Sequence, residues 1–193
     1  MKKVVVFDFD GTLTKKDTFV AFIRYACGNR AFVLGFLWYA PLLMLMILHL
    51  YPNDKAKQRV FSHFFKGMSL KTFDNLCQRF ARDNRHLLRP QGIQTLQQAQ
   101  ADGSDVFIVS ASIDNWVEPF FPETKVLGTQ VEVKDGRLSG RFLSKNCYGQ
   151  EKINRLLEKY PHREEYHLTA YGDSQGDKEL LAFADESHFK PFR

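Results

Sequence analysis

Asp8 and Asp10 stand two residues apart at the end of an apolar run, Val4 to Phe7. Four consecutive apolar residues are typical of a strand that is buried on both faces. Because residues i and i+2 of an extended segment point the same way, both carboxylates can face one site. Adjacent carboxylates repel and need a cation or a shared proton between them, and Mg²⁺ prefers such oxygen ligands. The same residues, followed by Gly11, also suit an ordinary polar turn.

Further polar residues follow the later apolar runs of the chain. Ser110 comes directly after the run 106–109, and Lys152 lies near the start of a helix predicted for 150–160. Asp173 and Asp177 follow the run 166–171. The carboxyl ends of parallel strands meet at one edge of a sheet, so we expect these side chains to converge with Asp8 and Asp10.

Three or four carboxylates, one hydroxyl and one ammonium suit phosphoryl transfer, which mainly needs positioning and charge neutralisation. Mg²⁺ between Asp8 and Asp173 would screen the approach of a carboxylate to a phosphate dianion. Lys152 would hold a phosphoryl oxygen as a point charge, and Ser110 would donate a hydrogen bond at a helix start. No Ser, Cys or His stands in a triad-like context in the sequence, which favours a carboxylate nucleophile and an aspartyl-phosphate intermediate.

Several other site types are excluded by spacing. The sequence has no P-loop pattern GxxxxGK[ST], and the Gly directly after Asp10 does not fit an EF-hand loop. The six histidines show no paired ligand spacing, and the basic segment carries no nucleic-acid motif. We therefore expect no nucleic-acid partner.

Strand patterns alternate with helix patterns, which predicts an α/β fold with a largely parallel sheet covered by helices on both faces. Strands are expected at 4–7, 106–109, 125–127, 166–171 and 188–189. The segment 129–142 alternates around Asp135-Gly136, which indicates a small β-hairpin. A chain of 193 residues suits one such core with an insertion.

The insertion is an all-helical segment over 15–89. From Lys15 to Pro90 the chain has thirteen Lys or Arg and four Asp or Glu, a local net charge of +9 that would attract anions. Helices are expected from Asp17 to Gly28 and over 54–89, with Ser69 as a cap after a break at Gly67.

The run Ala31–Leu50 holds twenty residues without a formal charge, about the length that crosses a bilayer. Pro41 should kink or break a helix there, so a hairpin of two short helices fits equally well. The run can be a buried layer of the insertion, an interfacial segment or a membrane span. Lys55, Lys57 and Arg59 follow it, a pattern that favours peripheral association with anionic lipid.

The three cysteines are far apart and form no CxxC pair, which fits a reducing compartment. The chain starts directly with a strand pattern, so no secretory signal is expected. These features predict a cytoplasmic protein, with the inner face of the membrane as the alternative location.

DFDGTLT, Ser110, Lys152 in GQEK, and GDSQGD together resemble the four motifs of the haloacid dehalogenase (HAD) phosphatase superfamily. The resemblance implies a Rossmann-like core over 1–14 and 90–193, with residues 15–89 as a helical cap of the phosphoserine-phosphatase-like branch. It implies that Asp8 is the nucleophile, that Asp10 is the general acid and base, and that Ser110, Ala111 and Lys152 bind phosphate. It also implies Mg²⁺ on Asp8, the Asp10 carbonyl and Asp173, with Asp177 in support.

Two departures bear on the substrate. Phosphoserine phosphatases usually carry a Glu soon after the first motif and paired glycines after the Ser of the second, whereas this chain has Lys15 to Thr18 and Ala111-Ser112. The apolar, basic cap resembles the bacterial phosphatidylglycerophosphatase C type, which implies a lipid phosphate. A soluble phosphomonoester is the alternative substrate, and a non-catalytic membrane-docking protein on the same scaffold is the alternative from another class.

Overall fold

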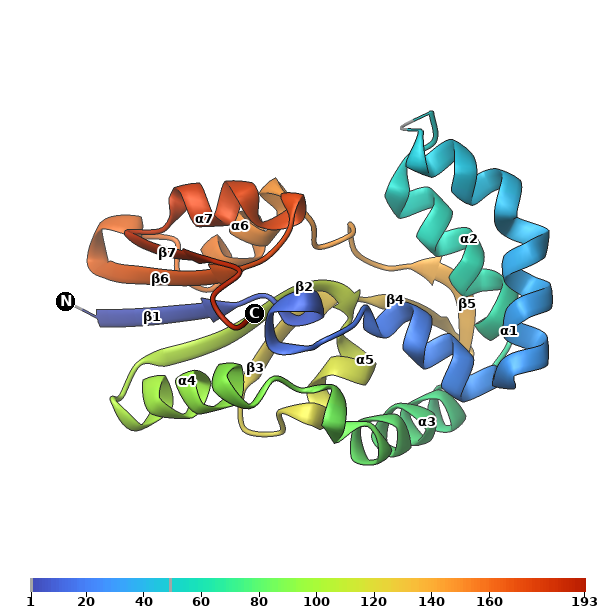
Figure 1. Cartoon of the computed structure of the whole chain (residues 1–193), viewed down its shortest axis with the longest axis horizontal. Coiled ribbons are helices and arrows are strands. Elements are labelled where there is room, and N and C mark those ends of the chain that lie inside the picture. The colour runs from blue at the N-terminus through green and yellow to red at the C-terminus, as the bar shows by residue number, and fades with distance from the viewer. Residues whose placement is uncertain (1, 49) are drawn as a thin grey trace.

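The computed structural model describes residues 2–48 and 50–193, and its centre is a parallel sheet in the order β3-β2-β1-β6-β7 (Figure 1). The strands are β1 (Lys2–Phe7), β2 (Asp105–Ile113), β3 (Lys125–Thr129), β6 (Tyr166–Gly172) and β7 (Glu186–Phe189). Every pairing between these neighbours is parallel. The predicted α/β fold with a parallel sheet is therefore confirmed.

β1 occupies the middle of the sheet because both of its faces are apolar. Val5 and Phe7 pack into one core cluster, and Val4 and Val6 into a second on the opposite face. The first cluster also contains residues of two helices, α4 (Pro90–Ala101) and α5 (Asp114–Val117). The second contains residues of α6 (Gln150–Leu157) and α7 (Lys178–Phe183), so helices cover both faces (Figure 1).

Three helices form the cap that follows β1: α1 (Thr18–Ile47), α2 (Asn53–Phe65) and α3 (Leu70–Asp83). Asp17 caps α1 by accepting hydrogen bonds from the next turn, and the Ser69 side chain caps α3 as predicted. The antiparallel hairpin of β4 (Val131–Lys134) and β5 (Arg137–Phe142) packs against α2. There the backbone N–H of Phe142 donates to Gln58 Oε1 at 2.8 Å.

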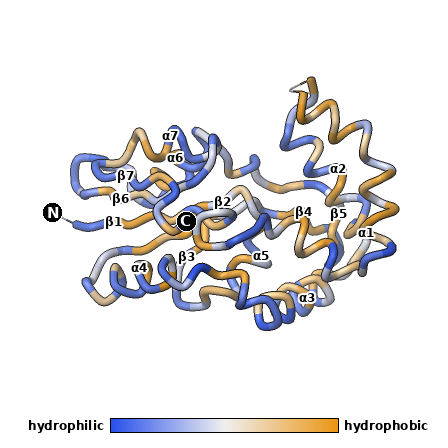
Figure 2. Tube along the Cα trace, in the orientation of Figure 1, coloured by the Kyte–Doolittle hydropathy of each residue, from blue (hydrophilic) through white to orange (hydrophobic). Residues whose placement is uncertain are grey.

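α1 is a single long element with an interruption at Gly28, where φ is +77° and the helix is kinked. The expected break at Pro41 is absent, since the helix continues through it to Ile47. Among the described residues, α1 is long and apolar enough to cross a membrane, and only 6% of its most apolar 18-residue window is buried. Figure 2 shows its hydrophobic colour at the edge of the molecule.

The exposure of α1 does not fit the first alternative given for Ala31–Leu50, a buried layer of the insertion. The exposed large apolar side chains of the region are those of Val33, Leu34, Leu37, Trp38, Met44, Leu45, Ile47, Leu48 and Leu50. We call these nine residues the apolar face. A monomeric protein rarely leaves such a patch uncovered without a function for it.

The two segments that connect cap and core run side by side. Thr14 and Leu88 form an antiparallel bridge, flanked by backbone hydrogen bonds from Lys15 to Leu87 and from Arg89 to Leu13, both 2.8 Å. The guanidinium of Arg89 also donates to the Thr14 carbonyl at 3.0 Å. The cap thus leaves the core through one paired connection, close to Asp10.

Phe22 of α1 joins the cap to the core. Its ring is fully buried and stacks on Trp116 of α5 at 4.8 Å, and it makes edge contacts with Phe73 and Phe80 of α3. We expect Phe22→Ala to lower the free energy of unfolding by about 3 to 5 kcal/mol, because it removes a large ring from a closed site. Urea denaturation followed by circular dichroism measures this loss.

Leu37→Ala is the matched control, since its side chain lies on the same helix and is 65% exposed. It should change the free energy of unfolding by less than about 0.5 kcal/mol. Equal losses for the two variants would contradict the packing described for α1.

Candidate active site

Lys152, the third residue of α6, lies at the centre of the predicted site. Its ammonium donates to Asp8 Oδ1 at 2.6 Å and to Asp177 Oδ1 at 2.5 Å, and its side chain is only 2% exposed. Burial by itself lowers the pKa of Lys152, but attraction to the two carboxylates outweighs burial and raises it. Lys152 is therefore a fixed positive charge held between two carboxyl groups.

Both carboxylate oxygens of Asp177 are already engaged. Oδ1 accepts from Lys152, while Oδ2 accepts from the backbone N–H groups of Asp173 and Ser174 and from the Ser174 hydroxyl, at 2.9–3.1 Å. Burial raises the pKa of Asp177, but Lys152 and these donors together bring it below its ordinary value. Asp177 thus orients Lys152 and the Asp173 loop, which is consistent with a supporting position rather than a free ligand.

Asp8 and Asp173 provide the open oxygen ligands. One oxygen each of Asp8, Asp173 and Asp177 lies within 4.8 Å of the others. Asp173 Oδ1 is buried without a hydrogen-bond partner among the described residues, and Asp173 Oδ2 is paired with Arg193. An orphaned buried carboxylate oxygen beside a second carboxylate fits a hard divalent cation such as Mg²⁺. The predicted ligand role of the Asp10 carbonyl stays a prediction.

Gly11 allows the first loop to approach Asp173 this closely. Its φ is +83°, and a Cβ added there would lie 2.4 Å from Asp173 Oδ2. A side chain at this position would push Asp173 away from Asp8. The glycine of the first motif therefore has a spatial reason as well as a conformational one.

Asp10 has donors of its own, separate from those of Asp8. Its Oδ1 accepts from the backbone N–H of Thr18 at the start of α1, at 2.7 Å, and its Oδ2 accepts from the Ser112 hydroxyl at 2.5 Å. Burial is the main cause that raises the pKa of Asp10, followed by repulsion from Asp17. The sequence analysis did not identify Ser112 as a partner of Asp10. The available signal was its position two residues after Ser110, which in a regular strand places both side chains on the same side of the backbone.

Ser110 and Ala111 lie within β2, whereas the sequence analysis expected Ser110 at a helix start. The register with β3 shifts between Val109 and Ile113, so residues 110–112 form a bulge. Such bulges re-aim side chains next to active sites. Gly128 of β3 permits this bulge, because a Cβ there would lie 2.8 Å from the Ser112 carbonyl.

The prediction that Lys57 would face a lipid surface is wrong. Lys57 is half-buried on α2, and its ammonium donates to the Ala111 carbonyl at 2.6 Å. Burial lowers its pKa. Lys57 lines a cavity of about 630 Å³, and Asp8, Asp10, Ser110 and Lys152 line the same cavity.

That cavity brings together the predicted site residues Asp8, Asp10, Ser110, Ala111, Lys152 and Asp173, while Asp177 lies directly behind Lys152. Its remaining wall comes largely from the cap, including Phe36, Leu43, Met46 and Ile47 of α1. The chemistry therefore lies on the core, and the cap contributes an apolar wall together with the cations Lys15, Lys16 and Lys57.

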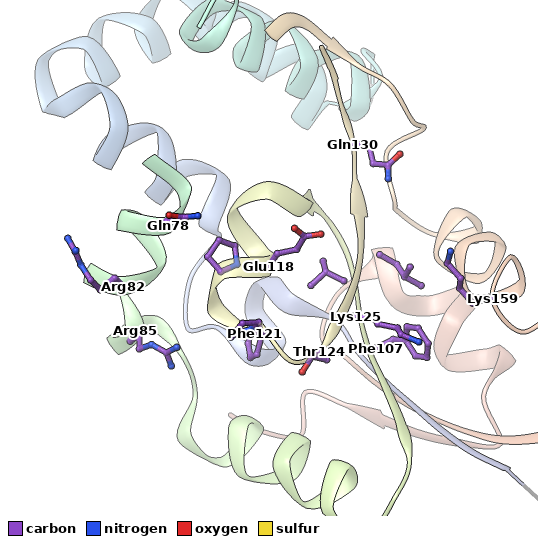
Figure 3. A pocket seen from close by; sticks show the side chains of 14 residues that line it. Gln78, Arg82, Arg85, Phe107, Glu118, Phe121, Thr124, Lys125, Gln130 and Lys159 are labelled. Carbon is purple, nitrogen blue, oxygen red and sulfur yellow. The ribbon is translucent and has the colours of Figure 1, made fainter. Parts of the chain in front are cut away.

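A wider hollow of about 900 Å³ lies elsewhere on the molecule, between α3 and the edge strand β3 (Figure 3). Its rim carries Arg82, Arg85, Lys125 and Lys159, together with Glu118. Arg82 is already paired with Asp83 at 2.9 Å and is largely exposed. The larger hollow thus differs from the catalytic cavity in its lining, which has Glu118 as its single acidic residue and lacks a cluster of carboxylates.

The metal-free protein should lose stability as the pH rises from 5 to 8. Burial raises the pKa of Asp8 from 3.8 to about 7 against the opposing effect of Lys152, so the folded state favours the protonated acid. This contribution is fully present below about pH 4 and is lost as the pH rises through 7. Between pH 5 and pH 8 the loss is about 2 to 3 kcal/mol. Urea denaturation in EDTA at pH 5 and pH 8 measures the change.

Asp8→Asn is the control for that pH dependence, because the amide does not titrate. We expect a clearly flatter dependence for this variant, and added Mg²⁺ should restore the wild-type protein most at pH 8. Identical slopes for the two proteins would show that Asp8 is not the group that titrates.

Comparison with known proteins agrees with this geometry. A family model described as haloacid dehalogenase-like hydrolase matches residues 5–182. Protein CicA of Caulobacter vibrioides is 36% identical over 196 residues, which cover 98% of this chain and 86% of that protein.

Two solved structures share the fold. A Bordetella pertussis Tohama I protein of unknown function superimposes with a TM-score of 0.84 at 19% identity, over 97% of this chain and 89% of that one. A phospho-aspartyl intermediate analogue of phosphoserine phosphatase gives a TM-score of 0.65 at 18% identity, over 96% and 85%. Taken with the family match over most of its length, the chain belongs to the haloacid dehalogenase-like hydrolases.

Proposed function

We propose that this chain hydrolyses a phosphomonoester through an aspartyl-phosphate on Asp8. The observation that carries the proposal is that two carboxylates in one cavity, Asp8 and Asp10, have different hydrogen-bond partners. Asp8 is paired with the Lys152 ammonium, whereas Asp10 accepts from a backbone N–H and a hydroxyl. Carboxyl groups in such different surroundings suit different roles in one reaction.

In the first step an Asp8 oxygen attacks phosphorus while the bond to the leaving oxygen breaks. The Asp10 carboxyl group gives its proton to that oxygen, and its raised pKa favours the protonated form this requires. In the second step the Asp10 carboxylate takes a proton from water, whose oxygen attacks phosphorus. The bond to Asp8 then breaks, and inorganic phosphate leaves with both carboxyl groups restored.

The other cavity residues bind and orient the phosphoryl group. Lys152 supplies a buried positive charge, and Ser110 and Ala111 lie on the β2 bulge that faces the same space. Lys57 brings a further cation from the cap toward an anionic substrate. Asp8, the Asp10 carbonyl and Asp173 would hold Mg²⁺ with Asp177 in support, and the ion would supply screening of the phosphate charge.

The relatives support this chemistry and also bear on the substrate class. The phosphoserine phosphatase structure named above contains an analogue of a phospho-aspartyl intermediate, which is a property of that protein. This chain carries Asp8 directly after β1, together with the ammonium and carboxylates described above. A small soluble phosphomonoester is accordingly the substrate class that these relatives favour.

We expect Asp8→Asn to abolish Mg²⁺-dependent hydrolysis of a generic aryl phosphate, with a loss of at least about 10³-fold in kcat, because an amide cannot form the covalent intermediate. Release of the aryl alcohol, followed by absorbance, measures the rate. Asp114→Asn is the matched control, since that partly buried carboxylate lies at the start of α5 and outside the cavity residues.

A wild-type protein that is inert on a broad panel of phosphate esters with Mg²⁺ would support the non-catalytic docking alternative. A substantial residual rate in Asp8→Asn would instead place the nucleophile elsewhere.

A lipid phosphate is a second candidate substrate, favoured by the apolar character of the cavity wall. Phe36, Leu43 and Met46 of α1 line the cavity, and seven of the nine residues of the apolar face lie on the same helix. A substrate held with its phosphate at Asp8 would thus meet apolar side chains along its remaining length. An acyl chain gains from such burial, whereas a polar soluble ester does not.

The outer side of the cap fits contact with an anionic lipid surface. Trp38 is 78% exposed and Leu37 65% exposed on α1, while Lys55 and Arg59 are exposed on α2. Apolar residues flanked by cations bind the interface of membranes that contain anionic lipids. We propose that this surface docks to the cytoplasmic face of such a membrane, which would bring lipid phosphates to the cavity.

Wild-type protein should float with vesicles containing anionic phospholipid, and Leu37→Gln with Trp38→Gln should reduce the bound fraction severalfold because it removes apolar area from the interface. Lys55→Ala with Arg59→Ala should weaken binding mainly at low salt. Both variants should keep the wild-type rate on an aryl phosphate, since neither alters a catalytic group.

Vesicles with and without a phosphatidic acid compare the substrates. Faster release of phosphate from the lipid than from soluble esters would support the lipid candidate. Protein that stays with the soluble fraction at any lipid charge would overturn membrane docking and leave the soluble phosphomonoester.

A further inference from the structure

The last four residues, Lys190–Arg193, form a strap that returns from β7 to the catalytic cavity. Lys190 adopts a positive φ of 54°, and its backbone N–H donates to the Gly172 carbonyl at 2.8 Å. Gly172 directly precedes Asp173, so the turn brings the strap beside the carboxyl end of β6. The C-terminal marker in Figure 1 lies next to the loop that follows β1.

The strap is held by specific contacts. The ring of Phe192 stacks on Tyr171 at 5.6 Å, and Tyr171 in turn stacks on Phe7 of β1 at 4.6 Å. The Phe192 carbonyl accepts a hydrogen bond from the Arg89 guanidinium at 3.1 Å. Arg89 also binds Thr14, so the same guanidinium joins the strap to the paired connection between cap and core.

This anchoring delivers the Arg193 side chain to Asp173. Its guanidinium pairs with Asp173 Oδ2, and Arg193 is one of the residues that line the catalytic cavity. The charge of Asp173 is thus balanced by a residue of the strap.

A divalent cation held by Asp8 and Asp173 would meet that guanidinium at the same carboxylate. The two positive groups repel, and each draws on the negative charge of Asp173. The Arg193 side chain is 46% exposed, so it has solvent to move into, whereas the Asp173 side chain is 8% exposed and fixed. The guanidinium is therefore the partner that can leave.

We propose that Arg193 is a latch on the metal site: it binds Asp173 when the ion is absent and is displaced into the cavity mouth when the ion binds. There the freed guanidinium faces the entering substrate, whose anionic groups it can contact. The latch rests on the metal site of the proposed function. It adds a residue that competes with the ion for Asp173.

The test compares the binding of Mn²⁺ or Mg²⁺ to metal-free proteins by isothermal titration calorimetry. Arg193→Gln should bind the ion about three- to tenfold more tightly than wild type, because a partly exposed ion pair no longer has to be broken. Lys190→Gln is the matched control: it removes a cation from the same strap that lies over Phe189 and not at Asp173, and it should bind the ion like wild type.

The Nε–H resonance of Arg193 gives a second readout that does not depend on activity. In protein labelled with ¹⁵N-arginine, the signal absent from Arg193→Gln should be protected from solvent exchange without metal and lose that protection when Mg²⁺ is added. Equal or weaker metal binding by Arg193→Gln, or a signal that Mg²⁺ does not change, would overturn the latch.

These outcomes are distinct from those that test hydrolysis. Wild-type protein that hydrolyses phosphate esters while Arg193→Gln binds metal like wild type would refute the latch alone. Tighter metal binding by Arg193→Gln in a protein that hydrolyses no ester would support the latch and refute the proposed activity.

Discussion

The buried Lys152 ammonium, shared between Asp8 and Asp177, is the interaction on which the rest of the site depends. Removing either carboxylate would leave charge uncompensated in a place that water does not reach, which is costly. The three groups come from β1, from α6 and from the turn after β6, so the pairing also fixes how these segments meet. The second carboxylate oxygen of Asp177 accepts hydrogen bonds from the backbone N–H groups of Asp173 and Ser174, and these bonds fix the position of Asp173.

The cap changes the character of this polar centre. It reaches the core through the paired connection, and the first residue of α1 donates its N–H to Asp10. The cap therefore contacts Asp10, the carboxylate for which we propose the proton-transfer role, at the first residue of α1, while later parts of the cap supply Lys57 and the apolar wall. The hydrogen bond from the Thr18 N–H to Asp10 thus links the position of the cap to the protonation state of Asp10. Such a link suits an enzyme that must exclude water while it transfers a proton.

The alternation of strand and helix patterns predicted the sheet and the helices that cover it. The polar residues that follow the apolar runs predicted the convergence of Asp8, Lys152 and Asp173, because strand ends in a parallel sheet share one edge. It did not predict the β2 bulge, since nothing local to 110–112 marks a register shift that depends on Gly128 of a neighbouring strand. Lys57 was misplaced for a similar reason: its charge is evident in the sequence, but the direction of its side chain depends on how α2 packs. Pro41 was expected to kink or break a helix, but α1 continues through it and the surrounding turns remain helical.

The Lys152 arrangement has a consequence for how the enzyme is assembled. Since a side chain already neutralises the carboxylates of Asp8 and Asp177, the catalytic centre can fold before any inorganic ion reaches it. An ion bound by Asp8 and Asp173 would then be able to enter the folded protein and to be replaced there. A single buried lysine would thus separate the folding of this centre from the binding of an ion.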